Sequence, residues 1–134
     1  MKLHLFAHNN RNLVKVGDKV EQYKTPIGTF GTAGGAYYAH LHFSISKDLT
    51  PSQIKGYVNG WTKDQVKQSY IEPKDINFNK MMPNMPINVG VNGYDWLDNY
   101  GKGYHPGVDV NGDGGGNTDF DWEFRASCNG KVIA

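Results

Sequence analysis

The chain has 134 residues and a formal net charge of +1, from Lys+Arg 14 and Asp+Glu 13. This length predicts one domain with a single core, and this charge balance gives no strong whole-chain field toward nucleic acid or an anionic membrane. The longest apolar run is far shorter than the ~18 residues that a membrane-spanning helix needs. Cys128 is the single cysteine, which excludes an internal disulfide and a cysteine-rich zinc site, so any metal must be bound by His, Asp and Glu.

Short strand-like runs between turn signals predict a mainly β fold, with antiparallel strands in a sheet or sandwich-like arrangement. The composition, with Gly 17 and Tyr 8, fits a turn-rich β protein better than a helical bundle. Four Asn-Gly pairs, at 59–60, 92–93, 111–112 and 129–130, predict tight turns because both residues tolerate positive φ. The expected strands, in chain order, are residues 3–8, 13–16, 26–30, 39–45, 107–110, 123–126 and 131–133.

Two capping boxes predict two short surface helices. Thr50 stands three residues before Gln53, and Thr62 stands three residues before Gln65, so each pair can satisfy the free amides of a helix start. We expect these helices near 51–58 and 63–70. Residues 79–93 show no hydrophobic period, and we expect them to form a linker or a wandering loop.

A His-x-His motif lies in the strand expected over 39–45. Residues two apart on a strand point to the same face, so His40 and His42 project side by side into one cleft. Leu41 and Phe43 then face the core behind them. On its own, such a pair is more often made of partly exposed strand residues than of metal ligands.

A second motif places His105 four residues before Asp109. Pro106-Gly107 allows a tight bend between them, and strand alternation then turns Asp109 to the side opposite its two Val neighbours. On its own, this spacing is more typical of a loop hydrogen bond than of a metal site. His8 ends the first strand, where alternation places it on the same face as Phe6 and His4.

The two motifs together offer two imidazoles and one carboxylate. This donor set suits a zinc ion whose fourth position stays open for water, which is the catalytic arrangement rather than the closed structural one. Because the chain has only five histidines, the combination of the two motifs predicts a metal site, although it does not identify a particular reaction.

The same residues resemble the two signature motifs of the lysostaphin-type (LytM-like) zinc endopeptidases of bacterial cell walls. The signatures are Tyr104-His105-Pro106-Gly107-Val108-Asp109 and His40-Leu41-His42-Phe43. Shorter stretches agree with the resemblance at residues 5–8, 14–20, 27–31, 70–73, 114–119 and 126–133. The resemblance covers most of the chain and implies the lysostaphin-type peptidase fold.

By this resemblance, His105, Asp109 and His42 bind one Zn²⁺ per site, and His40 and His8 are the two catalytic histidines beside it. The implied reaction is the hydrolysis of a peptide bond in peptidoglycan, in a stem or a cross-bridge and next to glycine or alanine, by a metal-activated water. One histidine takes the proton of the water, and the other stabilises the oxyanion or protonates the leaving amine. The division between these two roles stays open.

Gly-rich loops and aromatic residues flank both motifs and suggest a substrate groove. For most of these aromatic residues, core or turn packing is the simpler interpretation. Tyr104, which adjoins His105, and Tyr38 are the two residues that we predict to contact the substrate.

The order of the motifs differs from that of the family, in which His-x-x-x-Asp comes first and His-x-His last. The difference predicts a circular permutation within one domain, residues 1–134, in which 1–78 resembles the C-terminal half of the family domain and 94–134 its N-terminal half, joined by 79–93. A strand pair that relatives place between these halves is missing or much shortened. Completion of the site by two copies, as a domain-swapped homodimer, therefore stays open.

Three other functions stay open from the sequence. The first is a catalytically inactive cell-wall or protein-binding module on the same scaffold. The second is a carrier module, because residues 16–20 resemble the hairpin of biotinyl and lipoyl domains, although the lysine attachment motif is missing. The third is a zinc hydrolase of another small substrate.

The expected partner is the peptide of bacterial peptidoglycan, with neither nucleic acid nor a membrane. Residues 1–8 lack the apolar stretch and cleavage site of a secretory signal. We therefore expect an extracellular or virion-associated protein that lysis, a virion or a larger polypeptide delivers to the wall, such as a bacteriophage endolysin or tail component.

Overall fold

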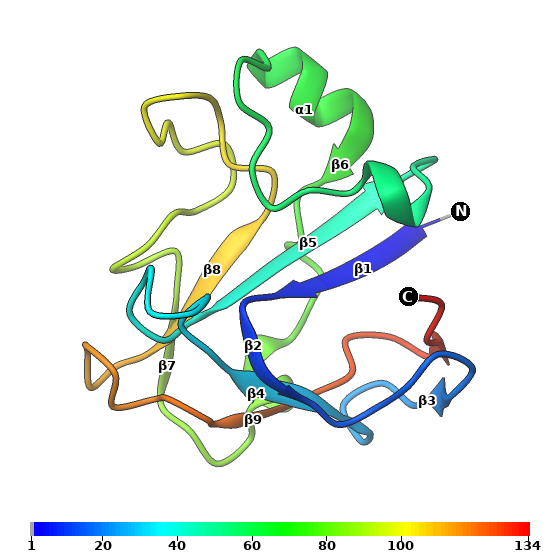
Figure 1. The fold of residues 1–134 in the computed structure, drawn as a ribbon, viewed down its shortest axis with the longest axis vertical. Helices are drawn as coiled ribbons and strands as arrows, with labels where there is room; N and C mark the ends of the chain where they lie inside the picture. Colours follow the sequence, from blue (N-terminus) through cyan, green and yellow to red (C-terminus); the bar gives the residue numbers. More distant parts are fainter. Residues whose placement is uncertain (1) are drawn as a thin grey trace.

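A computed structural model describes residues 2–134 and has the expected mainly antiparallel β fold (Figure 1). The elements of this part of the chain are, in order, β1 (Lys2–Ala7), β2 (Asn9–Asn12), β3 (Lys19–Val20), β4 (Pro26–Phe30), β5 (Leu41–Lys47), η1 (Pro51–Gln53), α1 (Lys63–Ser69), β6 (Tyr70–Ile71), α2 (Phe78–Met81), β7 (Ile87–Val89), β8 (Val108–Gly112), β9 (Glu123–Arg125) and β10 (Gly130–Lys131).

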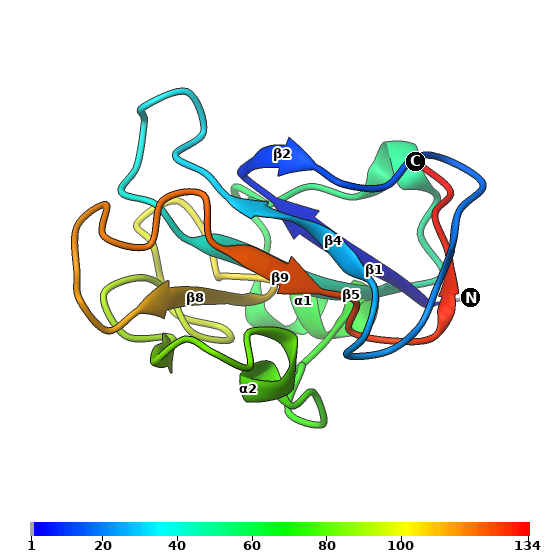
Figure 2. The same ribbon diagram turned by 90° about the horizontal axis from the view of Figure 1, so that it is seen from below.

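The strands form three antiparallel sheets. The largest has the order β1-β5-β8-β7, with β6 paired to β5. A second sheet has the order β2-β4-β9, and β10 pairs with β3 in a small third sheet. Figure 1 shows β1, β5 and β8 side by side with β2, β4 and β9 next to them, and Figure 2 shows α2 on the side away from β2.

The main core lies where the two larger sheets and α2 meet. Phe6 of β1 lies 5.3 Å from Phe43 of β5 and 5.4 Å from Phe124 of β9, measured between ring centroids. Phe78 of α2 meets the same Phe43 edge-on at 5.6 Å, and Met81 is fully buried beside it. These aromatic contacts fix β5 at the centre of the fold.

Strand β5 alternates as the sequence predicts. Leu41 and Phe43 are fully buried in the main core. His42 therefore points to the opposite face, where it pairs across the strands with Asp109 of β8 and, on its other side, with Ala7 of β1.

The two predicted helices fare differently. The helix at 63–70 is confirmed as α1, and Thr62 and Gln65 exchange the two hydrogen bonds of the expected capping box. The prediction of a helix at 51–58 is wrong. Only the single turn of η1 forms there, and Ile54 already has an extended backbone at φ −77° and ψ 131°. The residues after η1 are held by tyrosine hydroxyls instead of helical hydrogen bonds.

Three local expectations also differ from the structure. Residues 13–16 form no strand, since β2 ends at Asn12 and only the Leu13 amide still donates to a β4 carbonyl, that of Ile27. Segment 79–93 contains the end of α2 and also β7, which pairs with β8. The pair at 111–112 lies inside β8 rather than at a turn, because Asn111 and Gly112 pair with Asn88 and Ile87 of β7.

The start of β1 and the C-terminal residues lie on the same side of the molecule (Figures 1 and 2). Lys2 and Ala134 line one groove of about 720 Å³ between β1 and the last residues. Over residues 2–134, the helices are too short and too polar for any of them to cross a membrane.

Candidate metal centre

Three side chains predicted as metal ligands meet at one point of the largest sheet. His42 Nδ1 lies 3.1 Å from His105 Nε2, and Asp109 Oδ1 lies 3.4 Å from each of these nitrogen atoms. All three residues are buried. The three atoms form a compact triangle of possible donors.

The backbone explains why these residues converge. His42 and Asp109 are directly opposed on β5 and β8, and His105 reaches the same face across the bend at Pro106-Gly107. A Cβ atom on Gly107 would lie 2.2 Å from the Phe43 carbonyl oxygen, so only glycine lets this bend pass β5.

The hydrogen bonds around the centre leave electron lone pairs facing each other. His105 Nδ1 lies 2.8 Å from the Gly107 carbonyl, which can only accept, so the neutral ring carries its lone pair on Nε2. Asp109 Oδ2 accepts the Tyr94 amide at 2.9 Å, whereas Oδ1 is buried without a hydrogen-bond partner. The lone pairs of His105 Nε2 and Asp109 Oδ1, 3.4 Å apart, repel unless a metal ion or a proton on His42 Nδ1 lies between them.

The triangle has the dimensions that zinc requires. Donors at about 2.0–2.1 Å from a tetrahedral ion are about 3.3–3.4 Å apart, and the three observed separations are 3.1, 3.4 and 3.4 Å. The backbone contacts of His105 and Asp109 also orient both side chains, as outer-shell partners of metal ligands do. The residues therefore fit a zinc ion with one side left open.

Electrostatics keep Asp109 and His42 in the protonation states that a metal needs. Burial alone would raise the pKa of Asp109, but the imidazoles of His105 and His42 and the Tyr94 amide outweigh it and hold the pKa well below its ordinary value. Burial lowers the pKa of His42. At neutral pH, Asp109 is thus an anion and His42 a neutral imidazole.

His40 and His8 lie beside this centre. His40 Nδ1 donates to the Tyr38 carbonyl at 2.9 Å, which leaves the Nε2 lone pair of the neutral ring 3.8 Å from Asp109 Oδ1. The His8 ring lies 5.0 Å from His40 and 6.0 Å from His42. The Nε2 atoms of His8 and His40 are buried without partners, so both imidazoles offer an unused nitrogen there.

Strand alternation predicts His8 on the same face as Phe6, and this prediction is wrong. Phe6 packs in the main core, whereas His8 joins the other histidines. The reason is that β1 ends at Ala7 and His8 has a φ of 69°, a conformation rare for residues other than glycine. A Cβ on Gly31, which directly follows β4, would lie 2.2 Å from the His8 carbonyl oxygen, so the backbone at Gly31 passes His8 closely. Burial, followed by the neighbouring His40 and His42, lowers the pKa of His8 to about 4.

A groove of about 750 Å³ opens over the centre. Tyr38 lines its rim and is 73% exposed in the structure. Tyr104 does not line this groove; it packs with Val58 and Val66 in a second apolar cluster, and the Lys63 ammonium lies 5.3 Å from its ring centroid.

Sequence reasoning missed two tyrosines that line the groove, Tyr57 and Tyr94. Tyr57 lies in the stretch expected to be helical, so no pattern pointed it toward His42. Burial, the charge of Asp109 and the neighbouring Tyr37 raise the pKa of Tyr57, which keeps its hydroxyl protonated. Tyr94 follows an Asn-Gly turn signal, and only the pairing of its backbone with Asp109 brings it to the site.

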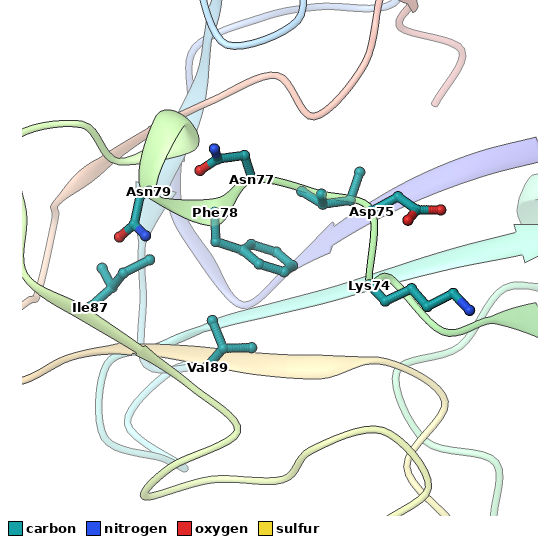
Figure 3. Close-up of a pocket in the computed structure, with 8 residues that line it drawn as sticks. Lys74, Asp75, Asn77, Phe78, Asn79, Ile87 and Val89 are labelled. Carbon is teal, nitrogen blue, oxygen red and sulfur yellow. The ribbon is translucent and has the colours of Figure 1, made fainter.

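A separate hollow of about 440 Å³ lies between residues 74–79 and β7. Figure 3 shows Phe78 pointing toward Val89 there, while the charged ends of Lys74 and Asp75 turn away. The five predicted site residues are all outside its lining, so the groove over the histidines is the candidate site.

A comparison with protein families gives one match, in which residues 2–54 fit the model of peptidase family M23. The matched part contains His8, His40 and His42, whereas His105 and Asp109 lie beyond it. No curated protein and no solved structure matches the chain. Residues 2–54 are thus similar to the peptidases of family M23, and this part supplies His42 to the cluster that it forms with His105 and Asp109.

Proposed function

We propose that this protein is a zinc endopeptidase that hydrolyses peptide bonds of bacterial peptidoglycan. The observation that carries the proposal is the buried triangle of His42 Nδ1, His105 Nε2 and Asp109 Oδ1, with an unpartnered carboxylate oxygen and a groove above it. The M23 match over residues 2–54 supports the reaction class. Peptidoglycan enters by the resemblance of both motifs to the lysostaphin-type enzymes.

In this proposal His42, His105 and Asp109 hold the ion. A zinc ion in such a site supplies Lewis-acid chemistry, since it lowers the pKa of water and polarises a carbonyl group. The side of the triangle beside the groove is open, since His40 and Asp109 line that groove. The Nε2 atoms of His40 and His8 have no hydrogen-bond partner and lie outside the triangle.

His40 is the proton acceptor of the reaction. The Tyr38 carbonyl fixes its Nδ1–H and so presents the Nε2 lone pair beside Asp109. His40 accepts a proton at Nε2 from the attacking water and returns it to the leaving amine. His8 is neutral at physiological pH because its pKa is lowered to about 4, and its free Nε2 is available to the substrate.

The test is to load the full chain with zinc and to measure bound metal and hydrolysis separately. Asp109→Ala and His105→Ala should lower zinc affinity by more than about 100-fold and abolish hydrolysis, because each removes a donor. His40→Ala should keep about one zinc per chain but lose about 100-fold or more in kcat. Zinc is quantified by atomic absorption, and hydrolysis by clearing of isolated cell walls and mass spectrometry of the released peptides.

His4→Gln is the matched control, because His4 contacts Ser127 rather than the centre. It should keep both zinc and activity. Loss of zinc in His40→Ala would contradict the assignment of ligands, and full activity of the metal-free wild type would contradict the metal mechanism.

A non-catalytic wall-binding module is the competing function. It predicts zinc-independent binding to cell walls and no released peptides. The clustering of five side chains at one place favours the enzyme, because binding alone needs no unpartnered imidazole nitrogen atoms. These five are His8, His40, His42, His105 and Asp109.

A further inference from the structure

Two tyrosines stand over the candidate metal centre from opposite walls of the groove. The Tyr37 ring lies 5.4 Å from His8 and 5.8 Å from His40. The Tyr57 ring lies 6.3 Å from His42 and 6.1 Å from His105. Between them, the two rings cover all four histidines of the site.

The two rings also approach each other. Their centroids are 6.5 Å apart with the planes tilted by 40°, which is within the range of direct aromatic contact. A peptide that reaches the centre between them must therefore be slim or must push the rings apart.

The Tyr57 wall is rigidly anchored. We call residues 54–61 the strap, which runs from η1 toward α1. The Tyr70 hydroxyl contacts both the amide and the carbonyl of Lys55 at 3.3 Å, and the Tyr100 hydroxyl accepts the Val58 amide at 2.9 Å. The Tyr100 ring supports Tyr57 edge-on at 4.8 Å, so the ring of Tyr57 has little freedom.

The Tyr37 wall is built differently. Its loop closes on itself, because the amides of Gly35 and Tyr37 both donate to the Thr32 carbonyl and the Ala36 amide donates to that of Ala33. Ala33 has a positive φ of 52°, and Tyr37 is 44% exposed. The Tyr37 side chain interacts with the strap through the hydroxyl of Tyr57, and its exposure makes this side of the pair the one that yields when that interaction opens.

We propose that Tyr37 and Tyr57 form an aromatic gate over the metal centre, and that this gate selects peptides by the size of the side chains next to the scissile bond. Both the covering of the metal and the selection of peptides rest on the proposed function, but the covering requires only bound zinc and not peptide hydrolysis. The gate takes no part in proton transfer. It acts by excluding volume, so removal of one ring should relax selectivity without removing a catalytic group.

The test compares the wild type with Tyr37→Ala, Tyr37→Phe and the control Phe120→Ala, all loaded with zinc. Phe120 is an exposed aromatic residue, 46% accessible, that does not line the groove. The first measurement is the rate at which the planar chelator dipicolinate removes zinc. Tyr37→Ala should accelerate removal by about tenfold at unchanged zinc affinity, while Tyr37→Phe and Phe120→Ala should match the wild type.

The second measurement is kcat/KM for two peptides that differ only in having glycine or leucine beside the scissile bond. Tyr37→Ala should raise the leucine-to-glycine ratio by at least about tenfold, which is the scale of discrimination by apolar bulk. Tyr57→Ala should raise it too.

Unchanged chelation rate and unchanged selectivity in Tyr37→Ala would overturn the gate. A fall in zinc affinity would also overturn it, because Tyr37 would then support the ligands instead of covering them. Faster chelation without any peptide hydrolysis by the wild type would uphold the gate and contradict the proposed endopeptidase.

Discussion

Asp109 unites the three features that define the candidate centre. Its Oδ1 faces two imidazole nitrogens at 3.4 Å, its Oδ2 is held by the Tyr94 amide, and its pKa lies far below the ordinary value. Strand alternation predicts that Asp109 faces away from Val108 and Val110, and the cross-strand pairing with His42 confirms this placement. Local sequence was therefore enough to bring two of the three proposed ligands to one face.

His8 shows where residue-scale prediction stops. Alternation assumes a continuous strand, but the chain turns at His8 with a φ of 69° and reverses the direction of its side chain. Gly31, which directly follows β4, approaches the His8 carbonyl closely at this turn, and a contact so distant in sequence leaves no local pattern.

The lowered pKa of His8 predicts acid sensitivity of the metal-free protein. As the pH falls from about 6.5 to about 4, the unfolded chain binds a proton at His8 and the folded chain does not, so stability is complete above this range and declines within it. His42 and His4, whose pKa values burial also lowers, act in the same direction. His8→Gln should therefore reduce the decline, which thermal melting in a chelating buffer at several pH values would measure.

A control for this experiment is Lys15→Gln, which removes one exposed positive charge outside the lining of the groove over the metal centre. It should leave the pH dependence as it is in the wild type. An equal slope in His8→Gln and in the wild type would contradict the burial of His8 as a neutral imidazole.

Among the elements, β5 and β8 and the bend between His105 and β8 form the frame of the site. The bend passes so close to β5 that a Cβ on Gly107 would lie 2.2 Å from the Phe43 carbonyl and 2.9 Å from the Ser44 Cβ. The nearest atom is the backbone oxygen of Phe43, and a strand backbone cannot move aside for an added methyl group as a flexible side chain can.

Gly107→Ala should therefore lower the free energy of unfolding by about 3 kcal/mol and weaken zinc binding, because it separates β8 from β5. Gly130→Ala is the control, since its Cβ would meet only the Cys128 sulfur at 3.9 Å, and its effect should stay within about 0.5 kcal/mol. Urea denaturation measures both. Wild-type stability in Gly107→Ala would show that the bend does not press on β5.

Element prediction succeeded where local chemistry determines the conformation. The capping box of Thr62 and Gln65 marks the start of α1, and the alternation of residues 41–45 marks β5. It failed in residues 51–58, where a capping box starts only one turn because the Tyr70 and Tyr100 hydroxyls hold the following backbone extended. β7 was missed because its three residues gain a strand conformation only by pairing with β8.

At the scale of the whole molecule, the histidines of the site come from distant parts of the chain: His8, His40 and His42 precede His105 by more than sixty residues. The M23 match covers residues 2–54, and the His105 and Asp109 motif follows more than fifty residues later. β1 and the C-terminal residues lie on the same side of the fold (Figures 1 and 2), and the circular permutation stays a prediction of the sequence. Because one chain brings all five site residues together, the structure itself requires no exchange of segments between copies.

The central claim is that His42, His105 and Asp109 hold one zinc ion. The most direct measurement is an anomalous difference map at the zinc edge from crystals of the zinc-loaded chain. We predict a single strong peak at about 2.0–2.2 Å from His42 Nδ1, His105 Nε2 and Asp109 Oδ1. A peak bound elsewhere, or a loaded crystal with no density between these three atoms, would contradict the account.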